Sequence, residues 1–340
     1  MSTLSKTLVI QTSPHITEGI STDAIMRNVV YALVPTTLFA IYAFGLGALL
    51  IIGTAVASCV LTEHLLCKLA KKESTISDWS AVITGILFGL TLPPNFPLWM
   101  VACGGFIAIV LGKFIFGGLG YNVFNPALVG RAVLQAAFPV AITTWYPALA
   151  ADRFSTLASS ILTPPFMQPE YTVRTGATPL SAMKFDHVAT SARDLIMGLT
   201  SGSTGETSAI FILIGGAYLV YRGMMNWRIP AAIFASVALL SSILHLVNPL
   251  YPSPWFMLFS GGLMLGAVFM ATDMVASPIT SIGAYVYGAI IGTLIVVIRI
   301  WGGLPEGVMY AILLGNAISP HIDNLIRPRV YGTGEKWSRA

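Results

Sequence analysis

A short run of small and hydroxyl-bearing residues is the first place in this sequence where chemistry could occur. Residues 174–180 read Arg-Thr-Gly-Ala-Thr-Pro-Leu. Gly176 and Ala177 add little side-chain bulk ahead of the Thr178 hydroxyl, and Pro179 disfavours helical backbone at the residue before it. The hydroxyl of Thr178 is therefore expected to stand out from extended backbone, where a modifying enzyme could reach it. On its residues alone, the same run also fits an ordinary turn.

A second polar stretch stands directly before an apolar run. Residues 200–208 read Thr-Ser-Gly-Ser-Thr-Gly-Glu-Thr-Ser, and Ser203 and Glu206 have the spacing of a capping box. A helix that begins here would present free backbone amides to an anion such as a phosphate, or to the carbonyl edge of a flavin. The pattern fits equally well a Glu206 that only caps the following helix.

Polar side chains inside apolar stretches form a third group of candidates. Arg131, Asn125, Asp273 and Arg299 interrupt or end such stretches. Ionisable residues at membrane depth are energetically costly and usually face a cavity, a partner or an ion path. Arg131 lies well inside its segment, whereas snorkelling or capping also explains Asp273 and Arg299 near segment ends. Arg131, Asn125 and Asp273 are the candidates for an ion site or a structural polar site.

Several other kinds of chemistry find no support. The three cysteines, Cys59, Cys67 and Cys103, lack Cys-x-x-Cys spacing, and the five histidines are scattered. The glycine-rich run 117–120 lacks the Gly-Lys-Ser/Thr ending of a phosphate loop. The net charge of +4 gives no reason to expect nucleic acid. We therefore assign no catalytic or metal-binding residue, and an organic cofactor is the expected carrier of any redox chemistry.

Composition places these residues in a membrane protein. The 340 residues are 55% hydrophobic and 9% charged, whereas a soluble domain has about 25% charged residues. Several apolar segments are short or contain Gly and Pro, so broken helices are expected among them. Ten segments are long enough, or nearly so, to cross a bilayer: 28–44, 46–66, 79–92, 97–112, 123–144, 206–221, 229–246, 255–271, 282–299 and 308–326.

Basic residues orient these segments. With both termini in the cytoplasm, twelve of the 18 Lys and Arg residues, Lys113 among them, lie on the cytoplasmic side, as the positive-inside rule requires. The loop between the two groups of spans then faces outward. The expected divisions are a cytoplasmic segment at 1–27, membrane halves at 28–144 and 195–326, an external loop at 145–194, and a cytoplasmic tail at 327–340.

The two membrane halves contain related segments. Residues 88–93 (FGLTLP) end the third apolar segment and residues 269–273 (FMATD) end the eighth, while 115–119 (IFGGL) corresponds to 300–304 (IWGGL). Five spans separate each pair, so corresponding segments point in opposite directions across the membrane. This pattern is typical of an inverted repeat, whose broken helices form a site near the membrane centre. Chance recurrence of Gly and Pro is the simpler alternative.

These motifs together resemble one family. Residues 175–180 and 202–208, the run 116–120 with Asn-Pro-Ala at 125–127, and residues 269–273 are similar to the RnfD/NqrB family of membrane subunits. The resemblance covers nearly the whole chain. The short N-terminus and the length look more like the RnfD branch, from the ion-translocating Rnf complex, than the longer NqrB branch.

The resemblance implies a covalent FMN on Thr178, joined through a phosphoester (a phosphothreonine ester) that a separate flavin transferase installs. The family pattern is Asp-x-x-Ser/Thr-Gly-Ala-Thr, and this chain has Thr172 at the Asp position. The cofactor-binding candidates are Thr175, Gly176, Ala177 and Thr178, with Ser203 and Glu206.

The resemblance also implies a non-covalent riboflavin among the spans and two inverted five-helix repeats similar to urea and ammonium transporters. It implies a bacterial inner-membrane translocase subunit, inactive alone, whose partner subunits pass electrons between ferredoxin and NAD while Na⁺ or H⁺ moves. The alternatives are an NqrB-like subunit of a sodium-pumping NADH:quinone reductase and a stand-alone channel or transporter.

Overall fold

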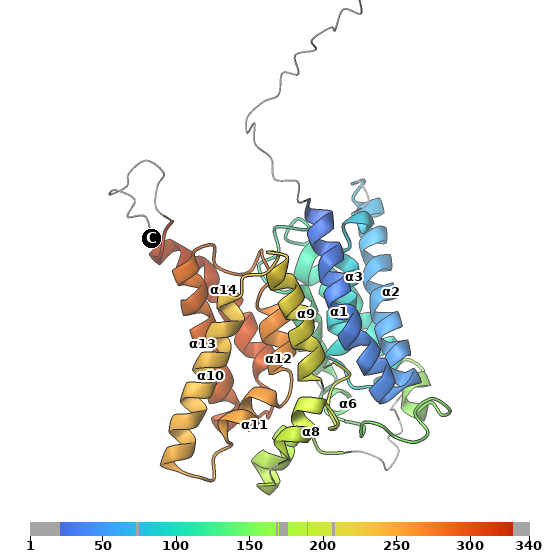
Figure 1. The fold of residues 1–340 in the computed structure, drawn as a ribbon. Helices are drawn as coiled ribbons and strands as arrows, with labels where there is room; N and C mark the ends of the chain where they lie inside the picture. Colours follow the sequence, from blue (N-terminus) through green and yellow to red (C-terminus); the bar gives the residue numbers. More distant parts are fainter. Residues whose placement is uncertain are drawn as a thin grey trace, which may run out of the picture.

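The computed structural model describes residues 21–72, 75–167, 169, 176–188, 190–205 and 208–328. Over these residues the protein is all-helical, without strands (Figure 1). Four helices are long and apolar enough to cross a membrane, judged by length and composition. A multi-pass, all-α membrane protein is therefore confirmed. The four helices are α1 (Thr22–Phe44), α2 (Leu46–Leu69), α10 (Arg228–Val247) and α13 (Ser281–Trp301).

Shorter helices make up the rest of the described fold, and η2, η4 and η5 are π-helical. They are η1 (Ile76–Asp78), α3 (Ser80–Leu90), α4 (Leu98–Ile109), η2 (Val110–Phe114), α5 (Pro126–Ala137), α6 (Pro139–Ile142), η3 (Ser159–Leu162), α7 (Pro179–Ser181), η4 (Ala182–Asp186), α8 (Ala192–Met197), α9 (Ala209–Tyr221), α11 (Pro254–Phe259), α12 (Leu263–Leu265), η5 (Gly266–Met270) and α14 (Val308–Leu325).

Two of the ten apolar segments are each divided between separate helices, in keeping with the expectation of broken helices. The segment at 123–144 splits into α5 and α6 because Pro139 pushes Phe138 out of helical geometry, to φ −132° and ψ 60°. The segment at 255–271 splits between α11 and α12, where Gly261 has a φ of +62° that side-chain-bearing residues rarely adopt. Proline and glycine thus end helices at positions where their backbone preferences favour a break.

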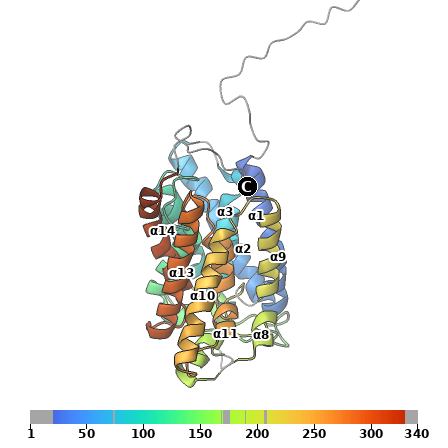
Figure 2. The same cartoon turned by 60° about the vertical axis from the view of Figure 1, so that its left-hand side comes forward.

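The long helices run side by side as a bundle, which Figure 2 shows from a second direction. α2 packs on α3 and α4, and α10 packs along α13. α1 packs on α9 and α5 contacts α14, so these pairs join the N-terminal helices to the C-terminal ones. The two ends of the described chain lie at one end of the bundle, and α6, α8 and α11 lie at the other (Figure 1).

A buried core continues through both groups of helices. It includes Phe88 of α3, Leu128 of α5, Ile212 of α9 and Tyr287 of α13. Large apolar side chains such as Leu61 of α2 are exposed on the outer faces of the long helices. Exposed leucines on such helices are what a lipid environment accepts.

Candidate functional site

Thr178 is the N-cap of α7 and is almost completely buried. Its backbone is extended, with φ −69° and ψ 153°, as Pro179 predicts. The residue is nevertheless only 3% exposed to solvent. The Thr178 hydroxyl donates to Ser181 Oγ at 3.0 Å and accepts from the Ser181 amide at 3.2 Å. The prediction of a protruding hydroxyl was wrong, because Pro179 starts a helical turn that the hydroxyl folds back to cap.

The residues before Thr178 are tied to two other parts of the chain. The Gly176 amide donates to the Trp145 carbonyl at 3.0 Å, and Ser201 Oγ donates to the Ala177 carbonyl at 2.7 Å. The structure therefore places Thr178 beside the 200–202 turn, near the polar stretch that precedes α9. Thr175 and Thr172 lie outside the described residues.

The residues after Thr178 are tied to α13. Lys184 of η4 donates to the carbonyls of Arg299 at 3.0 Å and Leu304 at 3.4 Å, and also to that of Gly302. These carbonyls belong to the C-terminal end of α13 and the loop after it, where a cation is favoured. Partial burial lowers the pKa of Lys184 from its ordinary value of 10.5. Leu180 adds an apolar contact with Leu195 and Phe256.

One cavity beside this segment, of about 150 Å³, lies at Leu180 and Lys184. Two others lie at Ala177 and Thr178. The larger, about 530 Å³, is bordered by residues of both membrane halves and of the segment itself. The smaller, about 10 Å³, lies at Thr178 between residues 200–202 and Gly261. Glu306 borders both. The polar and aromatic residues around the larger cavity are Arg131, Gln135, Thr143, Thr144, Trp145, Ser181, Phe185 and Glu306.

Arg131 joins the two groups of helices. It is 5% exposed and donates to the Thr91 carbonyl at the end of α3 and to Glu306 Oε2 at 2.7 Å. Sequence reasoning singled out Arg131 but missed Glu306, which lies in the Pro-Glu-Gly loop between α13 and α14. A loop carboxylate does not stand out in hydropathy. The one signal for such a partner was Arg131 itself, since an ionisable residue inside an apolar segment usually faces a cavity, a partner or an ion path.

Ser203 does not cap α9. That helix begins at Ala209 with Ser208 as N-cap, and Ser203 is fully buried, its Oγ without a hydrogen-bond partner among the described atoms. The stretch instead covers the end of α3: the amides of Thr204 and Gly205 donate to the Leu92 and Leu90 carbonyls. The predicted capping box is therefore wrong in position, and Glu206 lies outside the described residues.

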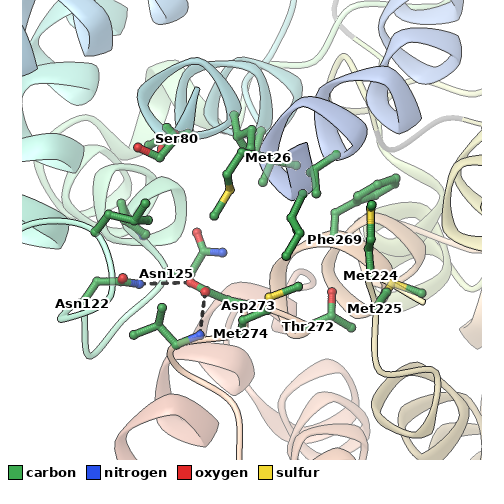
Figure 3. Close-up of a pocket in the computed structure, with 18 of the residues that line it drawn as sticks. Met26, Ser80, Asn122, Asn125, Met224, Met225, Phe269, Thr272, Asp273 and Met274 are labelled. Atoms are coloured by element: carbon green, nitrogen blue, oxygen red, sulfur yellow. Dashed lines mark hydrogen bonds between the residues drawn. The ribbon is translucent and has the colours of Figure 1, made fainter. Parts of the chain in front are cut away.

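Asn125 and Asp273 lie at a separate cavity, of about 130 Å³, between α1, α3, α9 and η5 (Figure 3). Asn125 caps α5 through the Ala127 amide and donates to the Met270 carbonyl at 3.3 Å. Asp273 accepts from Asn122 Nδ2 at 3.0 Å and from the Val275 amide at 3.1 Å. The structure thus places Asn125 and Asp273 together, whereas Arg131 lies apart from them, at the cavity of about 530 Å³.

A buried ion pair lies beside the same cavity. Lys113 of η2 is 4% exposed, and its ammonium lies 2.6 Å from Glu63 Oε1 of α2 and 2.5 Å from Ser80 Oγ. Lys113 was expected on the cytoplasmic side, and this stays a prediction; what the structure adds is its burial, because the π-helical turn that continues α4 directs it toward Glu63. Arg299, expected near a span end, is likewise buried and donates to the Met257 and Ser260 carbonyls. Within the described ranges no cluster of His, Cys, Asp or Glu could hold a metal ion.

Known proteins resemble this chain over nearly its whole length. The D-subunit of the proton-translocating ferredoxin:NAD(+) oxidoreductase complex of Clostridium ljungdahlii is 39% identical, covering 95% of this chain and 96% of its own. The D-subunit of the Na(+)-translocating ferredoxin:NAD(+) oxidoreductase complex of Acetobacterium woodii is 40% identical, covering 96% and 95%. The D-subunit of the ion-translocating oxidoreductase complex of Alcanivorax borkumensis is 37% identical, covering 96% and 97%. The sequence model of the NQR2, RnfD, RnfE family matches residues 9–332. The chain therefore belongs to the NQR2, RnfD, RnfE family.

Proposed function

We propose that this chain is the flavin-carrying membrane subunit of an Rnf-type complex, which couples electron transfer between ferredoxin and NAD to ion translocation. The observation that carries the proposal is full-length similarity to the D-subunits of two ferredoxin:NAD(+) oxidoreductase complexes, at 39% and 40% identity. One of these relatives is named for protons and the other for Na⁺, so the two nearly equal identities favour neither ion. The chain works as one component of the complex and needs its partners for turnover.

The flavin we propose on Thr178 is FMN in a phosphoester, attached by a flavin transferase. The larger cavity supports this position: at about 530 Å³ it has room for a ring system, and Ala177 and Ser181 border it directly. Trp145 and Phe185 offer aromatic faces there, and Arg131 and Gln135 offer hydrogen-bond donors. When bound, the flavin supplies one- and two-electron redox chemistry, and these residues orient its ring and set the polarity around it.

A second, non-covalent flavin, riboflavin, is proposed for the cavity of Figure 3. Its walls are mainly apolar, with Met26, Met224, Met225, Met274 and Phe269 around it. Methionine side chains adapt well to a flat ligand. A few polar groups, among them Asn122, Asn125 and Asp273, converge on one end (Figure 3). Such a cavity, apolar with a few convergent polar groups, is the usual form of a cofactor site.

The topology we propose is ten spans in two inverted five-helix repeats, with cytoplasmic termini and an outer loop that carries the FMN. Two observations support it. The ends of the described chain lie together at one end of the bundle, opposite α6 and α8 (Figure 1). Broken helices also occur in both halves, at α3 with its uncoiled 91–97 continuation and at α11–α12.

The competing function is a stand-alone channel or transporter, which the same repeat would serve. The observation in its favour is that the cavity of Figure 3 is bordered by Asn125 and a further cavity, of about 30 Å³, by Met270, and these two residues are joined by a hydrogen bond. It predicts ion or solute flux through the purified chain in liposomes without partner subunits or reductant. The Rnf-type function predicts no such flux. The electron acceptor of the isolated complex distinguishes the two kinds of subunit. An NqrB-like subunit predicts a complex that reduces quinone, and an Rnf-type subunit predicts one that reduces NAD⁺.

Mass spectrometry of the peptide that contains Thr178 tests the flavin directly. In cells that express the transferase, we expect this peptide to carry the added mass of an FMN ester and in-gel flavin fluorescence to follow the chain. Thr178→Ala should abolish both. An unmodified wild-type peptide, or fluorescence that survives Thr178→Ala undiminished, contradicts the proposal.

A further inference from the structure

The hydroxyl that would be esterified is closed off. Thr178 is 3% exposed, and its hydroxyl is engaged with Ser181 in two hydrogen bonds. The cavity beside it, about 10 Å³, has room for about one water molecule. A flavin donor cannot approach the hydroxyl through this space while the segment keeps its present position.

Attachment demands open space on both sides of the transferred phosphorus. An ester made from free FMN would release water and is uphill in water, so the donor must be activated, such as a flavin adenine dinucleotide. Thr178 Oγ1 would then bond to the flavin-side phosphorus, the pyrophosphate P–O bond would break, AMP would leave, and a base of the transferase would take the hydroxyl proton. Attacking and leaving oxygens lie roughly in line in such a transfer. A buried hydroxyl cannot meet this requirement.

The segment that carries Thr178 is held by separable contacts. We define the docking segment as residues 176–188. At its start, Gly176 and Ala177 bond to Trp145 and Ser201. Further on, Leu180 packs so closely on Gly261 that a Cβ there would lie 2.6 Å from Leu180 Cδ1. At its other end, the Lys184 ammonium reaches the carbonyls that end α13.

We propose that Thr178 receives its flavin while the docking segment is detached from Trp145, Ser201 and α13, and that Lys184 is a positioning residue that holds the segment on α13 once attachment is complete. This inference rests on the proposed FMN ester at Thr178. Redocking brings Ala177 and Ser181 back to the larger cavity, where the flavin finds its space. The Lys184 contact does not involve the hydroxyl, so it survives esterification. Flavin attachment therefore precedes the final closure of this face.

A disulfide staple tests the order of events. A Cβ built on Gly176 lies 3.3 Å from Ser201 Cβ, a few tenths of an ångström from the usual 3.5–4.5 Å (approximately) of a disulfide. Gly176→Cys/Ser201→Cys protein would be made without transferase, purified in detergent, and offered purified transferase with flavin adenine dinucleotide. We expect the oxidised pair to gain flavin at least about tenfold more slowly than the reduced pair, because the rate follows the detached fraction. Each single Cys variant serves as control, and equal rates for oxidised and reduced protein overturn the proposal.

A second variant keeps the test decisive if Gly176→Cys itself impairs recognition of the chain by the transferase. Lys184→Gln leaves residues 175–178 unchanged and removes the Nζ hydrogen bonds to the carbonyls that end α13. We expect it to raise the initial rate of flavin attachment to unmodified protein by about tenfold, through a larger detached fraction, whereas Lys184→Arg keeps the wild-type rate. An unchanged rate in Lys184→Gln overturns the role of Lys184. If wild-type protein gains no flavin under any condition, the proposed ester at Thr178 is wrong, a result distinct from flavin appearing on the stapled protein.

Discussion

Arg131 and Glu306 form an ion pair of 2.7 Å that joins α5 to the loop between α13 and α14. Both residues border the cavity of about 530 Å³ and a smaller one of about 30 Å³ between the two groups of helices. The pair therefore separates the space assigned to the flavin from the interior. Its removal should affect both stability and the flavin.

Removing one partner of this pair should cost more than neutralising it. Arg131→Ala leaves Glu306 without the guanidinium in a largely buried place, and loss of one partner of a buried pair costs about 3–5 kcal/mol. Glu306→Gln keeps a hydrogen bond from the Arg131 guanidinium but removes its counter-charge, and should cost about 1.5–3 kcal/mol. Thermal unfolding of the detergent-solubilised chain, with flavin absorbance followed in parallel, measures both. Equal melting temperatures for Arg131→Ala and wild type would show that the pair contributes nothing.

The second buried pair, Lys113 with Glu63, should behave differently when both partners are replaced. Lys113→Met leaves the Glu63 carboxylate, only 2% exposed, without its counter-charge and should destabilise by about 3–5 kcal/mol. Lys113→Met/Glu63→Leu replaces both charges with apolar groups and should recover most of that loss. The melting temperatures of the single and double variants test this expectation. A double variant no more stable than the single one would contradict it.

Gly205 should tolerate no side chain. A Cβ there would lie 2.5 Å from Leu90 Cβ, in the stretch whose amides cover the end of α3. Gly205→Ala should destabilise by about 1–3 kcal/mol through overpacking. Gly53 of α2 is the matched control, because a Cβ there has nothing within 4 Å, and Gly53→Ala should be neutral or slightly stabilising. Equal melting temperatures for the two variants would refute the close approach.

These contacts show what the sequence could and could not predict. Pro179 correctly predicted extended backbone at Thr178, since that effect is a local steric one. Burial of the hydroxyl depends on Ser181 together with Gly261 and the 200–202 turn, which are distant in sequence, and no local pattern encodes such packing. Hydropathy likewise located the long apolar helices. The burial of Lys113 was not predicted, because its partner Glu63 lies on another helix. The Glu306 partner of Arg131 was missed for the same reason.

Alkaline pH should tighten the docking segment rather than release it. Burial lowers the pKa of Lys184 in the docked state, so the docked segment binds its proton less tightly than a detached one with a pKa near 10.5. Docking is then favoured as pH rises from the lowered pKa toward 10.5 and is independent of pH below that window. The ratio of flavin-attachment rates, wild type over Lys184→Gln, should fall with rising pH there. A ratio that rises with pH would contradict this prediction, because it would mean that loss of the Lys184 proton favours the detached segment.

Two substitutions of Asp273 can distinguish a role in an ion site from a purely structural role. Its two oxygens accept hydrogen bonds from Asn122 and from the Val275 amide, and its neighbours around the cavity are mostly apolar (Figure 3). Asp273→Asn keeps the shape and one acceptor but removes the negative charge. If the charge serves ion movement, purified complex carrying Asp273→Asn should keep its flavins and ferredoxin:NAD⁺ electron transfer under uncoupled conditions, while ion uptake into liposomes falls. Asp273→Ala, which also removes the acceptor that holds Asn122, should lower the melting temperature as well. Because a carboxylate in such surroundings is normally retained for a charged partner or path, we expect the Asn variant to lose uptake, and unchanged uptake in this variant would assign Asp273 to structure alone.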